Sequence, residues 1–117
     1  FALRGDGGMA GGCAIPGELS LMDKGVKSLL EVSLSSDLHT LNMHCNRIAR
    51  IEGLSHLRNL QHLDLSSNQI RRMEGLSSLA NLCSLNLSCN LITKVEGYRE
   101  TVLQMLPQLT TLDGRSE

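Results

Sequence analysis

The residues that could do chemistry include the segment 43–54, MHCNRIARIEGL, where a histidine stands beside a cysteine and an asparagine. His44 and Cys45 could ligate a metal ion, or the imidazole could act as the base that activates the thiol. His62 could likewise work with a cysteine or with Asp64. Either chemistry needs an orienting third group and a sheltered pocket, so it depends on the elements that position these side chains.

Cysteine spacing argues against a metal centre. The four cysteines, Cys13, Cys45, Cys83 and Cys89, match no CxxC motif and no zinc pattern. The first residues, FALRGDGGMAGGCA, lack the basic flank and long apolar stretch of a secretory signal. We therefore predict reduced thiols in the cytosol, no metal and no cofactor.

Composition narrows the classes of partner. The net charge is −1 and the chain has one Phe, one Tyr and no Trp, so neither a basic field nor stacking aromatics favour a nucleic acid. No apolar run approaches the roughly 20 residues of a transmembrane helix. Leucine supplies 23 of the 117 residues, and an almost purely aliphatic core is natural for stacked repeats.

The chain repeats itself every 22 residues. Residues 38–59 read LHTLNMHCNRIARIEGLSHLRN, residues 60–81 read LQHLDLSSNQIRRMEGLSSLAN, and LCSLNLSCNLITKVEG restarts at 82. A fixed period of this length is typical of a solenoid in which each copy forms one turn. The fold class predicted is α/β.

Each turn should contribute one strand to a parallel sheet on the concave side. Leucines alternate with polar residues at the start of each copy, as in a half-buried strand. The asparagines at position nine, Asn46, Asn68 and Asn90, should satisfy backbone groups where the chain leaves the strand. A turn of 22 residues leaves room only for short 3₁₀ or extended pieces on the convex side.

The ends depart from the pattern. After Gly97 the segment YRETVLQMLPQLTTLDG places Val102, Leu103 and Leu106 at helical spacing before Pro107, which predicts a helical C-terminal cap with a last strand at 109–113. We predict a disordered glycine-rich tail at 1–17 and a repeat domain at 18–117. Its parts are an N-terminal cap at 19–37, repeats at 38–59, 60–81 and 82–108, and the C-terminal cap within 98–117.

The repeat explains the histidine and the cysteine of the opening segment. His44-Cys45 occupies the slot held by Ser66-Ser67 and by Ser88-Cys89 in the next copies. Cys45 and Cys89 lie two strand spacings apart, about 10 Å, which is too far for a disulfide. An open sheet also shelters no nucleophile, so no enzyme activity is expected.

These copies resemble the 22-residue, phosphatase-regulator-like class of leucine-rich repeats. The cap resembles the one shared by acidic nuclear phosphoproteins, a spliceosomal subunit and axonemal dynein light chains. LMDKGVKSL, LHTLNMHCN and LNLSCNLITKVEG are similar to the amino-terminal region of the centrosomal leucine-rich repeat and coiled-coil domain-containing proteins. That resemblance implies a scaffold at the centrosome or centriole, with a part in organising spindle poles and cilia.

The chain departs from those proteins in two ways. It passes from Gly97 directly to the cap, and it shows no sustained heptads, so it resembles a shortened form or a fragment, and we expect a monomer. Solenoids bind partners on the concave sheet. The outward residues are Thr40, Asn42, His44, His62, Asp64, Ser66, Ser84, Asn86 and Ser88, followed by Thr111 and Asp113.

The prediction is thus a non-enzymatic interaction module with one protein partner. A regulatory or adaptor subunit of another complex, such as a phosphatase, an axonemal dynein or a ribonucleoprotein, is the alternative.

Overall fold

The computed structural model describes residues 17–116. Apart from Gly17, the predicted tail at 1–17 lies outside the described residues. The elements are β1 (Glu18–Ser20), η1 (Leu29–Glu31), β2 (Thr40–Asn42), β3 (His62–Asp64), β4 (Ser84–Asn86), η2 (Ile92–Lys94), α1 (Tyr98–Met105), β5 (Thr111–Leu112) and β6 (Arg115–Ser116).

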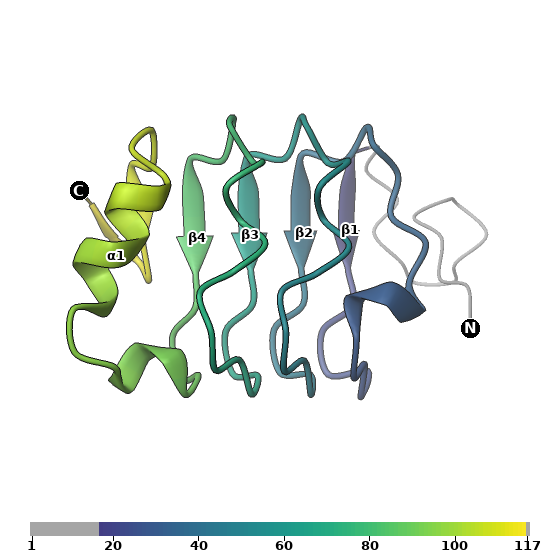
Figure 1. Ribbon diagram of the computed structural model, residues 1–117. Helices are drawn as coiled ribbons and strands as arrows, with labels where there is room; N and C mark the ends of the chain where they lie inside the picture. The colour runs from purple at the N-terminus through teal and green to yellow at the C-terminus, as the bar shows by residue number, and fades with distance from the viewer. Residues whose placement is uncertain (1–16, 117) are drawn as a thin grey trace.

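The strands form one sheet in the order in which they occur along the chain. β1 to β5 are parallel, and the first three steps pair residues 22 apart, such as Leu41 with Leu63. Figure 1 shows β1 to β4 side by side, with α1 beyond β4. The predicted solenoid with a parallel sheet is confirmed.

Leucine repeats make the core. The middle residues of β2, β3 and β4, which are Leu41, Leu63 and Leu85, are at most 2% exposed. Because strand side chains alternate between two faces, the residues on either side of them point away from the core. The flanking polar residues of each strand are therefore held at fixed positions on the concave face.

The recurring asparagines link each turn to the previous one. Asn68 Oδ1 accepts a hydrogen bond from Ile48 N (3.0 Å), and its Nδ2 donates to the carbonyls of Met43 and Leu65 (3.0 Å each). Asn46 and Asn90 make the corresponding bonds in their own turns. Between residues 17 and 97, the convex side carries turns and the short helices η1 and η2, as predicted.

The C-terminal cap contains the predicted helix. α1 buries Val102, and Leu106, the residue that follows the helix, is buried in the same core. β5 pairs with β4 at an offset of 27 residues, as between Leu85 and Leu112. The strand expected at 109–113 is shorter, because Asp113 and Gly114 have positive φ (53° and 81°). The chain reverses there and adds the antiparallel strand β6, which the sequence analysis missed.

Candidate functional site

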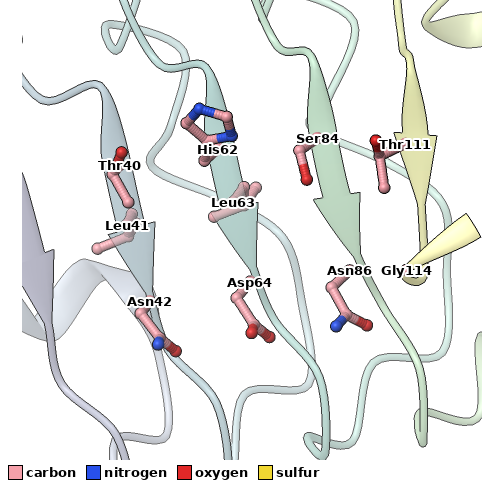
Figure 2. A pocket seen from close by; sticks show the side chains of 10 residues that line it. All are labelled: Thr40, Leu41, Asn42, His62, Leu63, Asp64, Ser84, Asn86, Thr111 and Gly114. Atoms are coloured by element: carbon pink, nitrogen blue, oxygen red, sulfur yellow. The ribbon is translucent and has the colours of Figure 1, made fainter. Parts of the chain in front are cut away.

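The first row of concave side chains crosses four strands. Register places Thr40, His62, Ser84 and Thr111 side by side, and Figure 2 shows their side chains along the upper part of the sheet. His62 is exposed and the other three are half-buried. Neither His62 nor Ser84 makes a side-chain hydrogen bond within residues 17–116, so these polar groups are open to a partner.

The second row, Asn42, Asp64 and Asn86, closes the turn at the end of each strand. The Oδ1 atom of each accepts a hydrogen bond from the backbone N–H two residues on: His44 (3.0 Å), Ser66 (2.9 Å) and Ser88 (3.0 Å). An Asx side chain commonly makes this bond in a turn. Of the two polar atoms at the end of each of these side chains, Oδ1 therefore stabilises the turn.

The third row lies beyond the strand ends. Ser66 is only 4% exposed. Its hydroxyl donates to Asp64 Oδ1 and lies 2.7 Å from His44 Nδ1. Since that hydroxyl proton is used on Asp64, the network assigns the proton of the second bond to His44 Nδ1. Ser88 is half-buried and donates to Asn86 Oδ1 (2.7 Å).

The first two rows line a shallow hollow of about 300 Å³ on the concave face. Its lining includes six of the nine predicted site residues, namely Thr40, Asn42, His62, Asp64, Ser84 and Asn86, together with Thr111 (Figure 2). His44, Ser66 and Ser88 lie outside it. No lysine or arginine is among the residues that line the hollow.

A sequence model of the leucine-rich repeat family matches residues 17–116. The match covers the whole solenoid, caps included. The chain belongs to the leucine-rich repeat family.

Sequence relatives of this leucine-rich repeat protein carry one name. Leucine-rich repeat and coiled-coil domain-containing protein 1 of Xenopus laevis is 63% identical over 45 residues, which is 38% of this chain and 4% of that protein. The human protein of that name is 62% identical over 46 residues, 39% of this chain and 4% of its own length. The predicted resemblance is confirmed, although the chain matches only a small fraction of these relatives.

A solved structure supports the same architecture. A chain in the crystal structure of the Drosophila melanogaster SNF/U2A′ complex superposes with a TM-score of 0.68 at 27% identity, covering 85% of this chain and 73% of that one. The likeness extends through most of the leucine-rich repeats and therefore concerns the whole fold rather than one motif.

The groups considered for catalysis are not assembled into a site. Register places His62 beside Thr40, whereas His44 contacts Ser66 beyond the other end of the strands, so the two histidines are not neighbours. Cys45 is an exposed free thiol. Within residues 17–116, no group of three His, Cys, Asp or Glu could hold a metal ion, and no helix there could cross a membrane.

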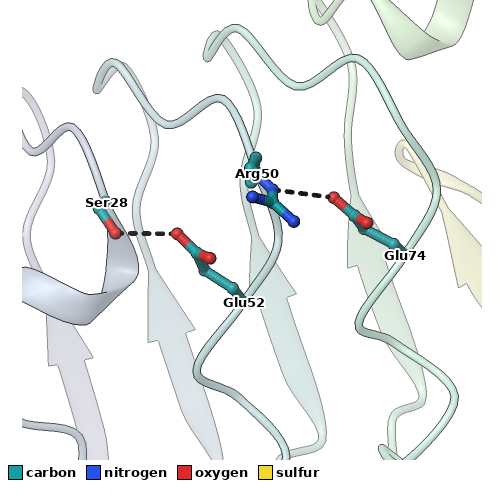
Figure 3. A network of polar contacts seen from close by, with 4 residues as sticks. All are labelled: Ser28, Arg50, Glu52 and Glu74. Carbon is teal, nitrogen blue, oxygen red and sulfur yellow. Dashed lines mark hydrogen bonds and ion pairs between the residues drawn. The ribbon is translucent and has the colours of Figure 1, made fainter.

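Two columns of charged residues recur at equivalent positions on one flank of the leucine-rich repeats: Arg50, Arg72 and Lys94, and two positions further on Glu52, Glu74 and Glu96. Arg50 Nε lies 3.4 Å from Glu74 Oε2, and Ser28 Oγ donates to Glu52 Oε2 (3.1 Å), as Figure 3 shows. The Arg50 side chain is 67% exposed, so this ion pair contributes only about 0–1 kcal/mol. We interpret the flank as a solvated edge.

Asp113 belongs to the cap. Its Oδ1 accepts from Leu87 N (2.6 Å) and its Oδ2 accepts from the Tyr98 hydroxyl (2.8 Å). Burial, and then this hydrogen bond to the carboxylate, raise the pKa of Tyr98 far above its usual value. Both carboxylate oxygens of Asp113 are thus occupied within the chain, unlike those of Asp64.

The sequence analysis missed the turns closed by the second row. Alternation placed Asn42, Asp64 and Asn86 among the outward residues of the concave sheet but did not predict their bonds to the backbone two residues on. The signal was available, because an Asn or Asp at the end of a strand, followed by a turn, favours this bond.

Proposed function

We propose that this leucine-rich repeat protein is a non-enzymatic interaction module that binds a protein partner on its concave sheet. The observation that carries the proposal is the first row, whose polar side chains lie in register across β2 to β5 and line a shallow, open hollow. Small-molecule sites bury most of their ligand in a cleft. A broad polar surface on a rigid sheet suits a protein segment better.

The sheet has room for a modest interface. Five parallel strands at about 4.8 Å spacing extend roughly 20 Å across the concave face. With the turns at both strand ends, this approaches the roughly 800 Å² per partner of a standard interface. The hollow has no lysine or arginine to neutralise phosphates, so we propose a protein rather than a nucleic acid as the partner, bound by a monomer.

We further propose that the module acts at the centrosome or centriole, in the organisation of spindle poles and cilia. The support is the identity of 62–63% with the leucine-rich repeat and coiled-coil relatives, together with the centrosomal role that the sequence resemblance implies. Because those matches span 4% of each relative, the role proposed here is limited to what this short domain can bind.

A second candidate is an adaptor subunit of another assembly, such as a phosphatase, an axonemal dynein or a ribonucleoprotein. It is favoured by the likeness, at 27% identity, to a chain solved within the SNF/U2A′ complex. Fractionation of a cell extract would separate the two candidates: co-sedimentation with centrosomes supports the first, and co-elution with one of those complexes supports the second.

A matched pair of variants tests the concave face. Ser84 lies in the first row and Ser77 is exposed on the return path outside the sheet, and neither side chain makes a hydrogen bond within the described residues. The full chain, fluorescently tagged, would be imaged in dividing cells as wild type, Ser84→Arg and Ser77→Arg.

We expect wild type and Ser77→Arg to accumulate at the centrosome and Ser84→Arg to be dispersed, because the added arginine fills the partner's place. Equal accumulation of all three would contradict the concave site. Absence of all three from the centrosome would contradict the proposed location.

A further inference from the structure

In the second row, the carboxylate of Asp64 lies between the amides of Asn42 and Asn86, and all three side chains close turns of the same kind. Asn86 Oδ1 accepts from both the N–H and the hydroxyl of Ser88, and Asp64 Oδ1 accepts from both the N–H and the hydroxyl of Ser66. An amide oxygen and a carboxylate oxygen are therefore interchangeable in this role. The turn after β3 does not need the negative charge that Asp64 carries.

The second oxygen of Asp64 is not used by the fold. No described residue donates a hydrogen bond to Asp64 Oδ2. Asp64 is half-buried and is the sole carboxylate among the residues that line the hollow, where its neighbours in the row are the neutral Asn42 and Asn86 (Figure 2). With no lysine or arginine in the lining, this negative charge is uncompensated within the hollow.

We infer that the partner inserts a basic side chain, arginine or lysine, into the hollow, where its cation contacts Asp64 Oδ2. A charge-assisted hydrogen bond is stronger than a neutral one, and like charges in the wrong partner would be repelled. The hydroxyls of Ser84 and Thr111 line the same hollow and offer acceptors for further N–H donors. The inference rests on the proposed function and names the partner's chemistry.

The test uses two small probes of the same shape. N-acetyl-arginine amide carries the cation, and N-acetyl-citrulline amide replaces it with a neutral urea. Each would be titrated into the full chain while backbone amide shifts are followed by NMR. We expect saturable shifts at Ser66 and its neighbours with the arginine probe, with a Kd on the order of millimolar, and binding at least about tenfold weaker with the citrulline probe.

Two substitutions move the charge without removing the turn. Asp64→Asn keeps the Oδ1 acceptor, as Asn86 demonstrates, and should abolish the preference for the arginine probe. Asn86→Asp adds a carboxylate one strand away and should bring shifts to Ser88. Equal responses to both probes in the wild type, or an unchanged titration in Asp64→Asn, would overturn the inference.

The imaging assay separates this inference from the proposed function. Loss of centrosomal accumulation in Asp64→Asn, as in Ser84→Arg, supports both. If Asp64→Asn accumulates normally while Ser84→Arg is dispersed, the concave face binds a partner but not through a basic side chain, and only the inference fails.

Discussion

Two columns of Asn and Asp side chains cross the same turns of this solenoid and differ in burial and in how many of their polar atoms are hydrogen-bonded. Asn46, Asn68 and Asn90 are at most 8% exposed and use both ends of the amide on backbone groups. We call them the buried column. Asn42, Asp64 and Asn86, the concave column, are half-buried and use only Oδ1.

The difference lies in how completely each side chain is used by the fold. Every polar atom of the buried column replaces a hydrogen bond that water would otherwise make, so any change leaves unsatisfied groups in an apolar core. The concave column closes its turns with one atom and leaves the other toward solvent. Residues of the same type can therefore be structural in one column and available for recognition in the other.

The largest effect should come from the buried column. Asn68→Ala would leave the N–H of Ile48 without an acceptor and would remove two further bonds, those to the carbonyls of Met43 and Leu65. Each of these carbonyls keeps one donor, the Nδ2 of Asn46 or of Asn90. We expect a loss of about 3 kcal/mol of unfolding free energy. Asn86→Ala in the concave column should cost only about 1 kcal/mol. Urea unfolding of both purified variants measures the two losses of unfolding free energy. Equal losses would contradict the difference between the buried and the concave column.

Replacing an asparagine by aspartate should also destabilise the protein more in the buried column than in the concave column. In Asn46→Asp the carboxylate would replace an Nδ2 that donates to the carbonyls of Leu21 and Met43, and a cost of about 2 kcal/mol or more is expected. Asn42→Asp keeps its Oδ1 acceptor and should stay within about 0.5 kcal/mol of wild type. Thermal unfolding of the two variants at neutral pH measures this difference. A destabilised Asn42→Asp would mean that folding depends on the neutral amide in the concave column.

The cap provides an intermediate case, because Asp113 continues the concave column but has both oxygens bound. Tyr98→Phe removes one of these bonds and should cost about 1 kcal/mol at neutral pH. The raised pKa of Tyr98 in the folded state means that folding favours the neutral phenol. The stability linked to it is present below pH about 10, the usual tyrosine pKa, and is lost as pH rises further.

Urea unfolding between pH 8 and pH 11, values chosen to bracket about pH 10, would check this linkage. Wild type should lose stability above pH about 10 more steeply than Tyr98→Phe. Parallel pH profiles for the two proteins would contradict the assigned role of the Tyr98 hydroxyl.

The smallest effect is expected outside both columns. Arg50→Ala removes an exposed ion pair with Glu74 and should change the unfolding free energy by less than about 1 kcal/mol. The same measurement in high salt should show almost no difference from wild type, because salt screens exposed charges. A larger loss would mean that the flank helps to hold the turns together.

The 22-residue period was sufficient to predict the sheet, its register and the buried column. Leu41, Leu63 and Leu85 had to align because one shifted residue would turn each leucine toward solvent. The cap helix followed from Val102 and Leu106 at helical spacing before Pro107. Strand β6 could not be predicted, since Arg115–Ser116 is too short to carry a pattern and depends on the reversal at Asp113 and Gly114.

The site was less accessible from sequence than the fold. Alternation correctly assigned Thr40, His62 and Ser84 to one face. It could not reveal that Ser66 is buried, because the Ser66 hydroxyl bonds to Asp64 within its own turn and contacts His44 of the preceding turn, and alternation does not predict such side-chain contacts. The contrast between Asp64 and Asp113 likewise depends on a tyrosine 15 residues away from Asp113.

The central claim is that the concave face is needed for binding but not for folding. One variant, assayed in two measurements, tests this claim most directly. Ser84→Arg in the full chain would be assayed for its unfolding free energy in urea and for centrosomal accumulation in cells. We predict stability within about 0.5 kcal/mol of wild type and loss of accumulation. A stable variant that still accumulates would contradict the account.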